Sequence, residues 1–446
     1  MATYVPNTLH EQQNMLASMG YSTIGELYSS IPKDVLLNRP LEIPNGLSEF
    51  EVRSKMTRLA DENKVFQTIY RGCGAYRHYI PTSVKYIASK EEFVTAYTPY
   101  QAEISQGTLQ AIFEFQTMIC ELTGMDVANA SVYDGATAAA EAVIMCREKK
   151  RTKVILSSTI NPEVIETIKT YLDGTEFDIS IVPDIDGRTD IEYLEKVISE
   201  ETACVMIQQP NYYGQIEDGD AIGKITKDCG AKYIMSCNPI ALGILKTPYE
   251  YGADIAVGEG QPLGIPLSFG GPYLGFMATT EKLMRKLPGR IVGETLDAQG
   301  RRAFVLTLQA REQHIRREKA SSNICSNQAL CALAACVYLS TLGRKGLEQA
   351  AILSMSHAHY LADQLCELGD FELVYQGEFF HEFVTRYKGD AKHLLRYLEN
   401  HGILGGYLIN DKEGLIIWCA TELNTKEEVD HLIEILKEVN ENEVNI

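Results

Sequence analysis

Between about residue 130 and residue 280, short apolar runs alternate with helical segments, and this alternation constrains the fold more than any other feature. The apolar runs are bounded by turn residues and lie at 154–156, 179–182, 204–207 and 233–235. The helical segments between them lie at 161–173, 191–200 and 220–228. Such a pattern predicts βαβ units and a mostly parallel sheet. No GxGxxG motif follows the first strand, which disfavours a dinucleotide-binding domain.

The chain before this region reads as helical. Three capping-box patterns predict helix starts, at Thr8-x-x-Glu11, Thr23-x-x-Glu26 and Ser48-x-x-Glu51. We therefore expect residues 1–65 to form an N-terminal helical arm that packs on another surface. A long helix is predicted from Gln106 to about Leu122, with Gly124 ending it.

The chain after this region changes character twice. From about 300 to 345 it is basic and then helical, with Ser321-Ser322-Asn323 predicted to cap the apolar helix. The last ~100 residues shift to strands at 371–375, 382–387 and 414–419, and a final helix opens with the box Thr425-x-x-Glu428. We expect a large α/β domain over 66–330 and a small α+β domain over 331–446.

Composition excludes some classes of partner. The net charge of −19 disfavours nucleic acid and an anionic membrane surface, because both require a basic face. The eleven cysteines form no CxxC pair, and His357 and His359 lie two residues apart, so no metal site is expected. No signal peptide is evident, and the longest apolar run, 329–339, is too short to span a bilayer. We expect a soluble cytoplasmic protein with reduced thiols.

A loop rich in glycine and proline separates two expected strands, 255–257 and 273–277. Such loops let backbone approach a ligand closely. The run is similar to the one that follows the Schiff-base lysine in enzymes using pyridoxal phosphate (PLP). Aligning Ile265-Pro266 and Gly270-Gly271-Pro272 with that pattern places Gln261 at the lysine position. A glutamine amide cannot form the imine bond to PLP.

Three further stretches could carry chemistry. Asp134-Gly135-Ala136-Thr137 opens a helix of small residues, which suits a phosphate cup or close packing on a sheet equally well. The loop 98–107 concentrates hydroxyl, amide and carboxylate groups, and Tyr97 and Tyr100 flanking its proline favour a functional role over turn chemistry. The basic segment 314–323 could donate to a phosphate, although in isolation it reads as a solvated helical face.

Taken together, three long stretches closely resemble the P-protein of the glycine cleavage system. They are TAYTPYQAEISQGTLQAIFEFQTMICELTGMDVANASVYDGATAAAEA, GEGQPLGIPLSFGGPYLGF and REQHIRREKASSNICSNQAL. The length and Gln261 are similar to the first of two subunits in bacteria that split this protein. The resemblance implies a fold-type I PLP-dependent transferase-like architecture, that of the aspartate aminotransferase superfamily.

The resemblance also implies an activity. With a second subunit in an α2β2 heterotetramer, the family decarboxylates glycine bound to PLP. It then passes the aminomethyl group to the lipoyl arm of the H-protein and releases CO2. The resemblance thus implies the activity of glycine dehydrogenase (aminomethyl-transferring), an oxidoreductase expected to work only as the complex.

Site residues follow from the resemblance position by position. Ser236 stands where an aspartate would pair with the pyridine nitrogen, so together with Gln261 it implies that PLP is held by the partner. Residues 134–137 would then be a relic phosphate cup. Two groups would complete the partner's site across the interface. The group near glycine is Tyr97, Thr98, Tyr100, Gln101 and Glu103, and the group near the cofactor phosphate or lipoyl tunnel is Arg317, Lys319, Ser322 and Asn323.

Two other interpretations stay open at this point. The chain could be a structural or regulatory partner whose pocket residues contribute nothing chemical. It could also be a self-sufficient PLP enzyme that uses another lysine, for which Lys246 is the nearest upstream candidate.

Overall fold

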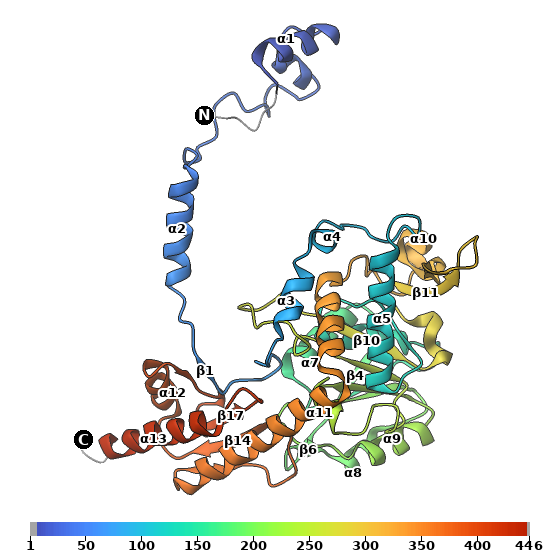
Figure 1. The fold of residues 1–446 in the computed structure, drawn as a ribbon. Helices are drawn as coiled ribbons and strands as arrows, with labels where there is room; N and C mark the ends of the chain where they lie inside the picture. The colour runs from blue at the N-terminus through green and yellow to red at the C-terminus, as the bar shows by residue number, and fades with distance from the viewer. Residues whose placement is uncertain (1–6, 444–446) are drawn as a thin grey trace. The chain divides into compact units, whose positions relative to one another are not determined.

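The N-terminal segment forms a unit of its own in the computed structural model, which describes residues 7–443 (Figure 1). Its elements are α1 (Leu9–Ser18), the 3-10 helix η1 (Ile24–Tyr28) and α2 (Glu49–Asp61). The predicted capping boxes at Thr8 and Ser48 are confirmed, since each side chain accepts the N–H three residues on. The box at Thr23 is wrong. Its hydroxyl donates to Glu26 instead of accepting a backbone N–H, and the helix lasts five residues.

This unit exposes most of its apolar side chains. Leu16 is the one buried side chain among residues 7–65. Phe50, Val65 and Leu9 are each at least 70% exposed. Isolated exposed apolar residues are ordinary, but a whole segment of them indicates a surface that packs on something outside its own unit. Residues 7–65 therefore have no core of their own.

A seven-stranded sheet organises the second unit, residues 66–446. Its strand order is β2-β10-β9-β8-β7-β3-β4, and every pair is parallel except those that β10 makes with β2 and β9. The strands are β2 (Val127–Ala128), β3 (Lys153–Ser157), β4 (Asp178–Val182), β7 (Thr202–Gln209), β8 (Lys232–Cys237), β9 (Ile255–Glu259) and β10 (Gly275–Thr279). The strands predicted in this region, and a mostly parallel sheet, are confirmed.

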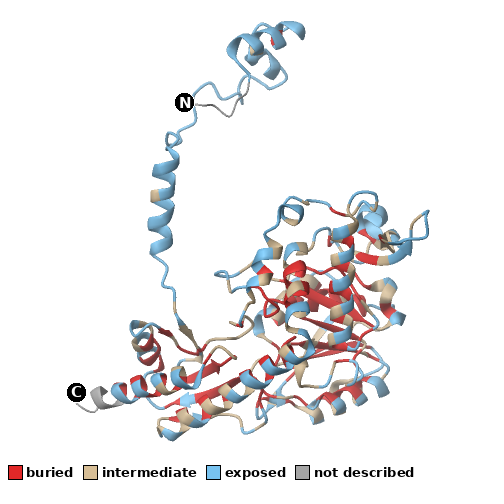
Figure 2. Ribbon diagram, viewed as in Figure 1, coloured by how far each residue is buried: buried red, intermediate tan, exposed pale blue. Residues whose placement is uncertain are grey.

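Helices bury both faces of this sheet, and Figure 2 shows the buried residues concentrated on its strands. One core includes Phe115 and Phe276, and the other includes Leu156 and Val257. On one face α3, α5 and the first half of α11 lie side by side (Figure 1). The helices are α3 (Thr82–Ala88), α4 (Glu91–Val94), α5 (Gln106–Thr123), α6 (Gly135–Met145), α7 (Pro162–Leu172), α8 (Ile191–Val197) and α9 (Gly219–Asp228). The expected stop of α5 is confirmed, because Gly124 adopts a left-handed conformation with φ 72°.

The segment from residue 291 to 328 differs from the prediction. It opens with an antiparallel hairpin, β11 (Ile291–Leu296) and β12 (Arg302–Thr307), and continues in short helical turns. These turns are η4 (Gln309–Arg311), α10 (Gln313–Arg316) and η5 (Arg317–Lys319). The predicted cap at 321–323 is wrong, since α11 begins at Ala329. The Ser322 hydroxyl instead accepts the N–H of Ile324 at 3.1 Å in a local turn.

A four-stranded antiparallel sheet, β13-β14-β17-β16, forms the C-terminal part. Its elements are β13 (Phe371–Leu373), β14 (Glu382–Tyr387), α12 (Ala391–Asn400), β15 (Ile403–Leu404), β16 (Tyr407–Asn410), β17 (Leu415–Cys419) and α13 (Lys426–Glu443). Buried Trp418 lies at its centre. The predicted box is confirmed, because the Thr425 N–H donates to Glu428 and the Glu428 N–H donates to Thr425. Short elements complete the unit, namely β1 (Thr68–Ile69), β5 (Asp184–Ile185), β6 (Arg188–Thr189), η2 (Ala241–Gly243) and η3 (Glu281–Lys286).

The helix α11 (Ala329–Glu367) joins the two sheets. Its first half packs in the large-sheet core through residues such as Tyr338, and its second half packs in the small-sheet core through Leu361. By length and composition it is the one helix in the described part of the chain that could cross a membrane. Gly343 interrupts it with non-helical backbone, and its apolar side chains serve both cores. The domain boundary at residue 331 stays a prediction, and α11 runs through it.

Candidate active site

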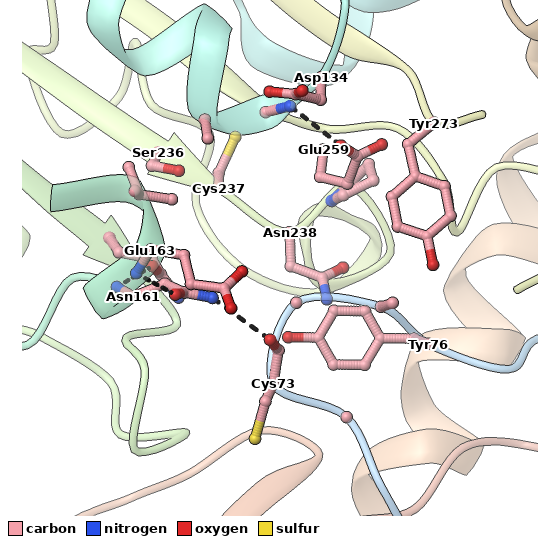
Figure 3. Close-up of a pocket in the computed structure, with 18 of the residues that line it drawn as sticks. Cys73, Tyr76, Asp134, Asn161, Glu163, Ser236, Cys237, Asn238, Glu259 and Tyr273 are labelled. Atoms are coloured by element: carbon pink, nitrogen blue, oxygen red, sulfur yellow. Dashed lines mark hydrogen bonds between the residues drawn. The ribbon is translucent and has the colours of Figure 1, made fainter. Parts of the chain in front are cut away.

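A cavity of about 440 Å³ lies where the carboxyl ends of the parallel strands meet (Figure 3). Ser236 and Cys237 end β8, Glu259 ends β9, and Asp134 to Ala136 begin α6. The remaining wall comes from the loop 72–76, the start of α7, Gln208, Asn238, Pro239 and Tyr273. Ligands of open α/β sheets bind at this edge. The structure thus brings the predicted residues 134–136 and Ser236 to one cavity.

Gln261 lies next to this cavity with its side chain buried and 1% exposed. Its Oε1 accepts the N–H of Tyr76 at 2.8 Å. Its Nε2 donates to the carbonyl oxygens of Tyr76 at 2.9 Å and Ile265 at 2.7 Å. The amide therefore ties the loop 72–76 to the glycine-rich loop, and it uses both ends of the amide to do so.

The N-terminus of α6 is already bound by carboxylates. Glu259 Oε2 accepts the N–H of Gly135 at 2.9 Å, and Asp134 Oδ1 accepts that of Thr137 at 2.7 Å. A Cβ atom on Gly135 would lie 2.8 Å from the Glu259 nitrogen, so this close approach requires glycine. In Figure 3 the Asp134 and Glu259 side chains lie together at the start of the helix. Two donors that a phosphate would use are thus occupied by negative groups.

Glu259 also accepts two further backbone N–H groups, from Gln261 at 2.9 Å and Leu274 at 2.8 Å. Burial raises the pKa of Glu259 to about 7, although the three N–H donors oppose that shift. The carboxylate therefore joins the end of β9 to the start of α6 and to the residue before β10.

Sequence reasoning missed the pair Tyr76 and Glu382. The Tyr76 hydroxyl donates to Glu382 Oε2 at 2.7 Å, and the Cys73 N–H donates to Oε1 at 2.6 Å. The Tyr76 ring centroid lies 4.6 Å from that of His381. Burial raises the pKa of Glu382 to about 7. The aromatic, glycine-rich run YRGCGAYRHY was the available signal, but Glu382 comes from a strand some 300 residues further on.

The residues predicted near glycine do not line this cavity. Thr98, Gln101 and Glu103 are exposed, and Tyr97 is 95% exposed. Tyr100 turns inward, with the Arg290 guanidinium carbon 5.1 Å from its ring centroid and its hydroxyl 3.4 Å from Asn327 Oδ1.

The residues predicted near the cofactor phosphate lie at a second cavity, of about 380 Å³. Arg317, Ser322 and Asn323 line it together with Glu141, Ile144, Tyr171, Gln313, Ala320 and Ser321, whereas Lys319 is exposed and outside it. Burial raises the pKa of Glu141 to about 7. Arg317 adopts a positive φ of 53°, a conformation that costs backbone strain in a residue other than glycine. The predicted residues are thus distributed over two cavities and one exposed loop.

Lys246 lies away from both cavities. It is exposed, and its Nζ pairs with Asp220 Oδ2 at 2.7 Å. The described residues contain no group of three His, Cys, Asp or Glu side chains that could hold a metal ion. His357 and His359 each contact a backbone carbonyl oxygen.

Comparison with known proteins gives one consistent family. The family described as "Glycine cleavage system P-protein" matches residues 2–436. "Probable glycine dehydrogenase (decarboxylating) subunit 1" of Desulfitobacterium hafniense is 50% identical over 443 residues, covering 98% of this chain and 99% of the relative. The protein of the same name from Moorella thermoacetica is 49% identical over 440 residues, covering 98% and 99%.

Comparison with solved structures gives the same family. A crystal structure of glycine decarboxylase (P-protein) of the glycine cleavage system, in inhibitor-bound form, superimposes with a TM-score of 0.92 at 41% identity. It covers 98% of this chain and 100% of that chain. A sphingosine-1-phosphate lyase from Burkholderia pseudomallei, with a TM-score of 0.64, 16% identity and coverage of 93% and 94%, shows the shared fold alone.

Proposed function

The chain belongs to the glycine cleavage system P-protein family as a subunit 1, and we propose that it is the half of glycine dehydrogenase (decarboxylating) that does not hold PLP. The observation that carries this proposal is the buried amide of Gln261. Its oxygen accepts from Tyr76, and its nitrogen donates to Tyr76 and Ile265. No reactive amine stands at that position, and the neighbouring backbone depends on the amide. The fold is that of PLP-dependent fold-type I enzymes.

The residues at the cavity beside Gln261, at the carboxyl ends of the parallel strands, do not fit PLP. The phosphate of the cofactor would meet Asp134 and Glu259 at the N-terminus of α6, where their carboxylates already accept two N–H groups. The residues that line the cavity include Glu163 and contain no lysine, arginine or histidine. Ser236 offers a hydroxyl where a pyridinium would need a carboxylate. These contacts support a second subunit as the holder of the cofactor.

PLP on the second subunit would supply the electron sink for decarboxylation of glycine. This chain would contribute the exposed loop that carries Tyr97, Thr98, Gln101 and Glu103, which can complete a site in another subunit because these side chains point to solvent. Arg317, Ser322 and Asn323, gathered at the second cavity, would bind an anionic group of the complex. The residual aminomethyl group would pass to the lipoyl arm of an H-protein.

A stable complex with the second subunit is part of the proposal, in an α2β2 heterotetramer. The apolar side chains of residues 7–65 support it, because they are left uncovered within their own unit. The eleven cysteines are free thiols, which agrees with a reducing, cytoplasmic location.

A non-catalytic scaffold is the second candidate. It is favoured by the larger of the two cavities described above, whose lining does not fit PLP and contains no lysine, arginine or histidine. A self-sufficient PLP enzyme using Lys246 has no support, because that lysine is exposed and paired with Asp220.

Glycine-dependent exchange of labelled bicarbonate tests the proposal, with lipoylated H-protein and PLP present, with and without the second subunit. We expect exchange from the mixture and none from either subunit alone. Exchange by this chain alone would show that a lysine here holds the cofactor. Exchange by the second subunit alone, at the rate of the mixture, would favour the scaffold.

A further inference from the structure

The loop of residues 97–105 is exposed in its side chains but ordered in its backbone. The Tyr100 N–H donates to the Thr98 carbonyl at 2.9 Å, and the Ser105 N–H donates to the Gln101 carbonyl at 3.0 Å. Pro99 is buried, and Tyr100, Ala102 and Ser105 are half-buried; Tyr100 and Ala102 pack against the same hydrophobic cluster. The inward residues must therefore fix where the outward ones are presented.

Tyr100 contacts two residues from distant parts of the chain. The guanidinium of Arg290 lies over its ring, 5.1 Å from the centroid, in the range of a cation–π contact. The Tyr100 hydroxyl donates to Asn327 at 3.4 Å. Burial raises the pKa of Tyr100 and Arg290 opposes that rise, so the phenol stays protonated as a donor. The ring is thus held from its face and at its hydroxyl.

Arg290 is itself fixed. Its Nη1 pairs with Glu312 Oε2, whose side chain is 5% exposed, and the Ala130 N–H donates to the Arg290 carbonyl at 2.8 Å. His314 and Arg311 also face Glu312. The side chain of Arg290 is thus held by a buried carboxylate and its backbone by Ala130, and together they make it a rigid support for the Tyr100 ring.

Gln106 fixes the other end of the loop. Its Nε2 donates to the carbonyl oxygens of Ala102 at 2.7 Å and Phe304 at 2.9 Å, and its Oε1 accepts the Phe304 N–H at 2.8 Å. The loop is therefore attached at Tyr100 and at Gln106 to the segment that contains the β11–β12 hairpin.

We infer that Arg290 is a positioning residue for glycine decarboxylation, because it anchors, through the ring of Tyr100, the loop that this chain presents to the second subunit. Tyr100 is then an anchor and not a reacting group. The inference rests on the proposed function, in which Tyr97, Thr98, Gln101 and Glu103 complete the partner's site. A displaced loop would misplace these groups and weaken glycine binding.

The test is a double-mutant cycle in the complex with the second subunit, with KM for glycine and kcat measured by bicarbonate exchange. Arg290→Met and Tyr100→Leu should each raise KM about tenfold, with a smaller effect on kcat. The double variant should be no worse than either single one, since both remove the same contact. Arg290→Lys keeps the cation beside Glu312, and Tyr100→Phe keeps the ring, so each should raise KM less than about threefold.

A matched control is Arg302→Met, because Arg302 lies 5.0 Å from the Phe304 ring centroid and pairs with Glu294 on the exposed hairpin. It should leave KM at the wild-type value. Hydrogen exchange of the amides of residues 97–105 gives a readout independent of turnover, and it should accelerate in Arg290→Met and not in Arg302→Met. Sedimentation of each mixture identifies variants that fail to assemble. If Arg290→Met or Tyr100→Leu fails to assemble, Arg290→Lys or Tyr100→Phe is measured in its place.

Several outcomes overturn the inference. Loss of activity in Tyr100→Phe equal to that in Tyr100→Leu would make the phenol a reacting group. Unchanged amide exchange in Arg290→Met would show that Arg290 does not hold the loop. Faster exchange with a wild-type KM would show that the loop lies away from the site. If the wild-type mixture has no bicarbonate exchange, the proposed function fails, and the amide-exchange arm still decides whether Arg290 anchors the loop.

Discussion

The side-chain amide of Gln261 pairs with both backbone polar groups of Tyr76, accepting its N–H at 2.8 Å and donating to its carbonyl at 2.9 Å. The side chain of one loop thus satisfies both backbone polar groups of a residue in another loop. Both hydrogen bonds are buried. A lysine could replace the donor but not the acceptor. Restoring a lysine would therefore damage the wall of the cavity.

We predict that Gln261→Lys creates no PLP enzyme. The Tyr76 N–H would lose its partner and an ammonium would be buried, so unfolding free energy should fall by about 2–4 kcal/mol. Denaturant unfolding measures that loss, and absorbance with borohydride trapping detects an imine at residue 261. The wild-type chain mixed with PLP is the control. A trapped lysine at 261 in a protein of wild-type stability would contradict the prediction.

The buried carboxyl of Glu382 predicts a pH dependence of stability. Its pKa is raised from 4.5 in the unfolded chain to about 7 in the fold, so the folded state binds the proton more tightly. The stability from this proton is fully present below pH 4.5 and is lost as pH rises through about 7. Glu259 and Glu141 are shifted in the same direction, to about 7.

Glu382→Gln should remove part of this dependence, because the amide resembles the protonated acid and can still accept the Cys73 N–H. Urea unfolding at several pH values between 5 and 8 should show a flatter profile, by up to about 1.4 kcal/mol per pH unit. The free energy of unfolding of the variant should rise relative to that of the wild type as pH rises. Parallel profiles for the two proteins would contradict the assignment.

Much of the large domain could be predicted because its signals are local. Runs such as 154–156 are bounded by turns, and a parallel strand needs little more than such a run and a following helix. The hairpin β11–β12 was missed because its strands carry charged residues, including Glu294 and Arg302, that pair with each other on an exposed surface. Charge alone could not distinguish that ribbon from a solvated helix.

The candidate site divides in the same way. Residues 134–136 were found because they start a predicted helix, whereas Gln261 and Ser236 were found through the resemblance to PLP-dependent enzymes. Glu259 and Glu382 were missed, since their importance comes from partners at 124 and 306 residues' separation, Gly135 and Tyr76. Tyr100 was found but its orientation was not, because Arg290 lies on a segment for which the sequence predicted no element.

We predict that the second subunit binds an exposed apolar face of α2. Val52, Met56 and Leu59 are 44%, 58% and 48% exposed, and their spacing puts them on one helix face. Replacing all three with glutamine should weaken assembly with the second subunit, measured by sedimentation velocity, while the thermal unfolding of the chain alone stays unchanged. Ser54, Thr57 and Arg58 lie on the opposite face, and alanine at all three is the control. Equal assembly by both variants would show that this face is not an interface.

Arg317 distinguishes a chemical contribution from a scaffold. Arg317 lines the second cavity together with Ser322, and its backbone φ of 53° is one that glycine adopts without strain. Arg317→Gln should lower bicarbonate exchange at least about tenfold with assembly intact, because an anionic group of the complex would lose its cation. Arg317→Gly separates the charge from the backbone, since it relaxes the conformation but also removes the guanidinium. Loss in both variants assigns the effect to the charge. Activity retained in both, with the complex assembled, would remove Arg317 from the site and favour the scaffold.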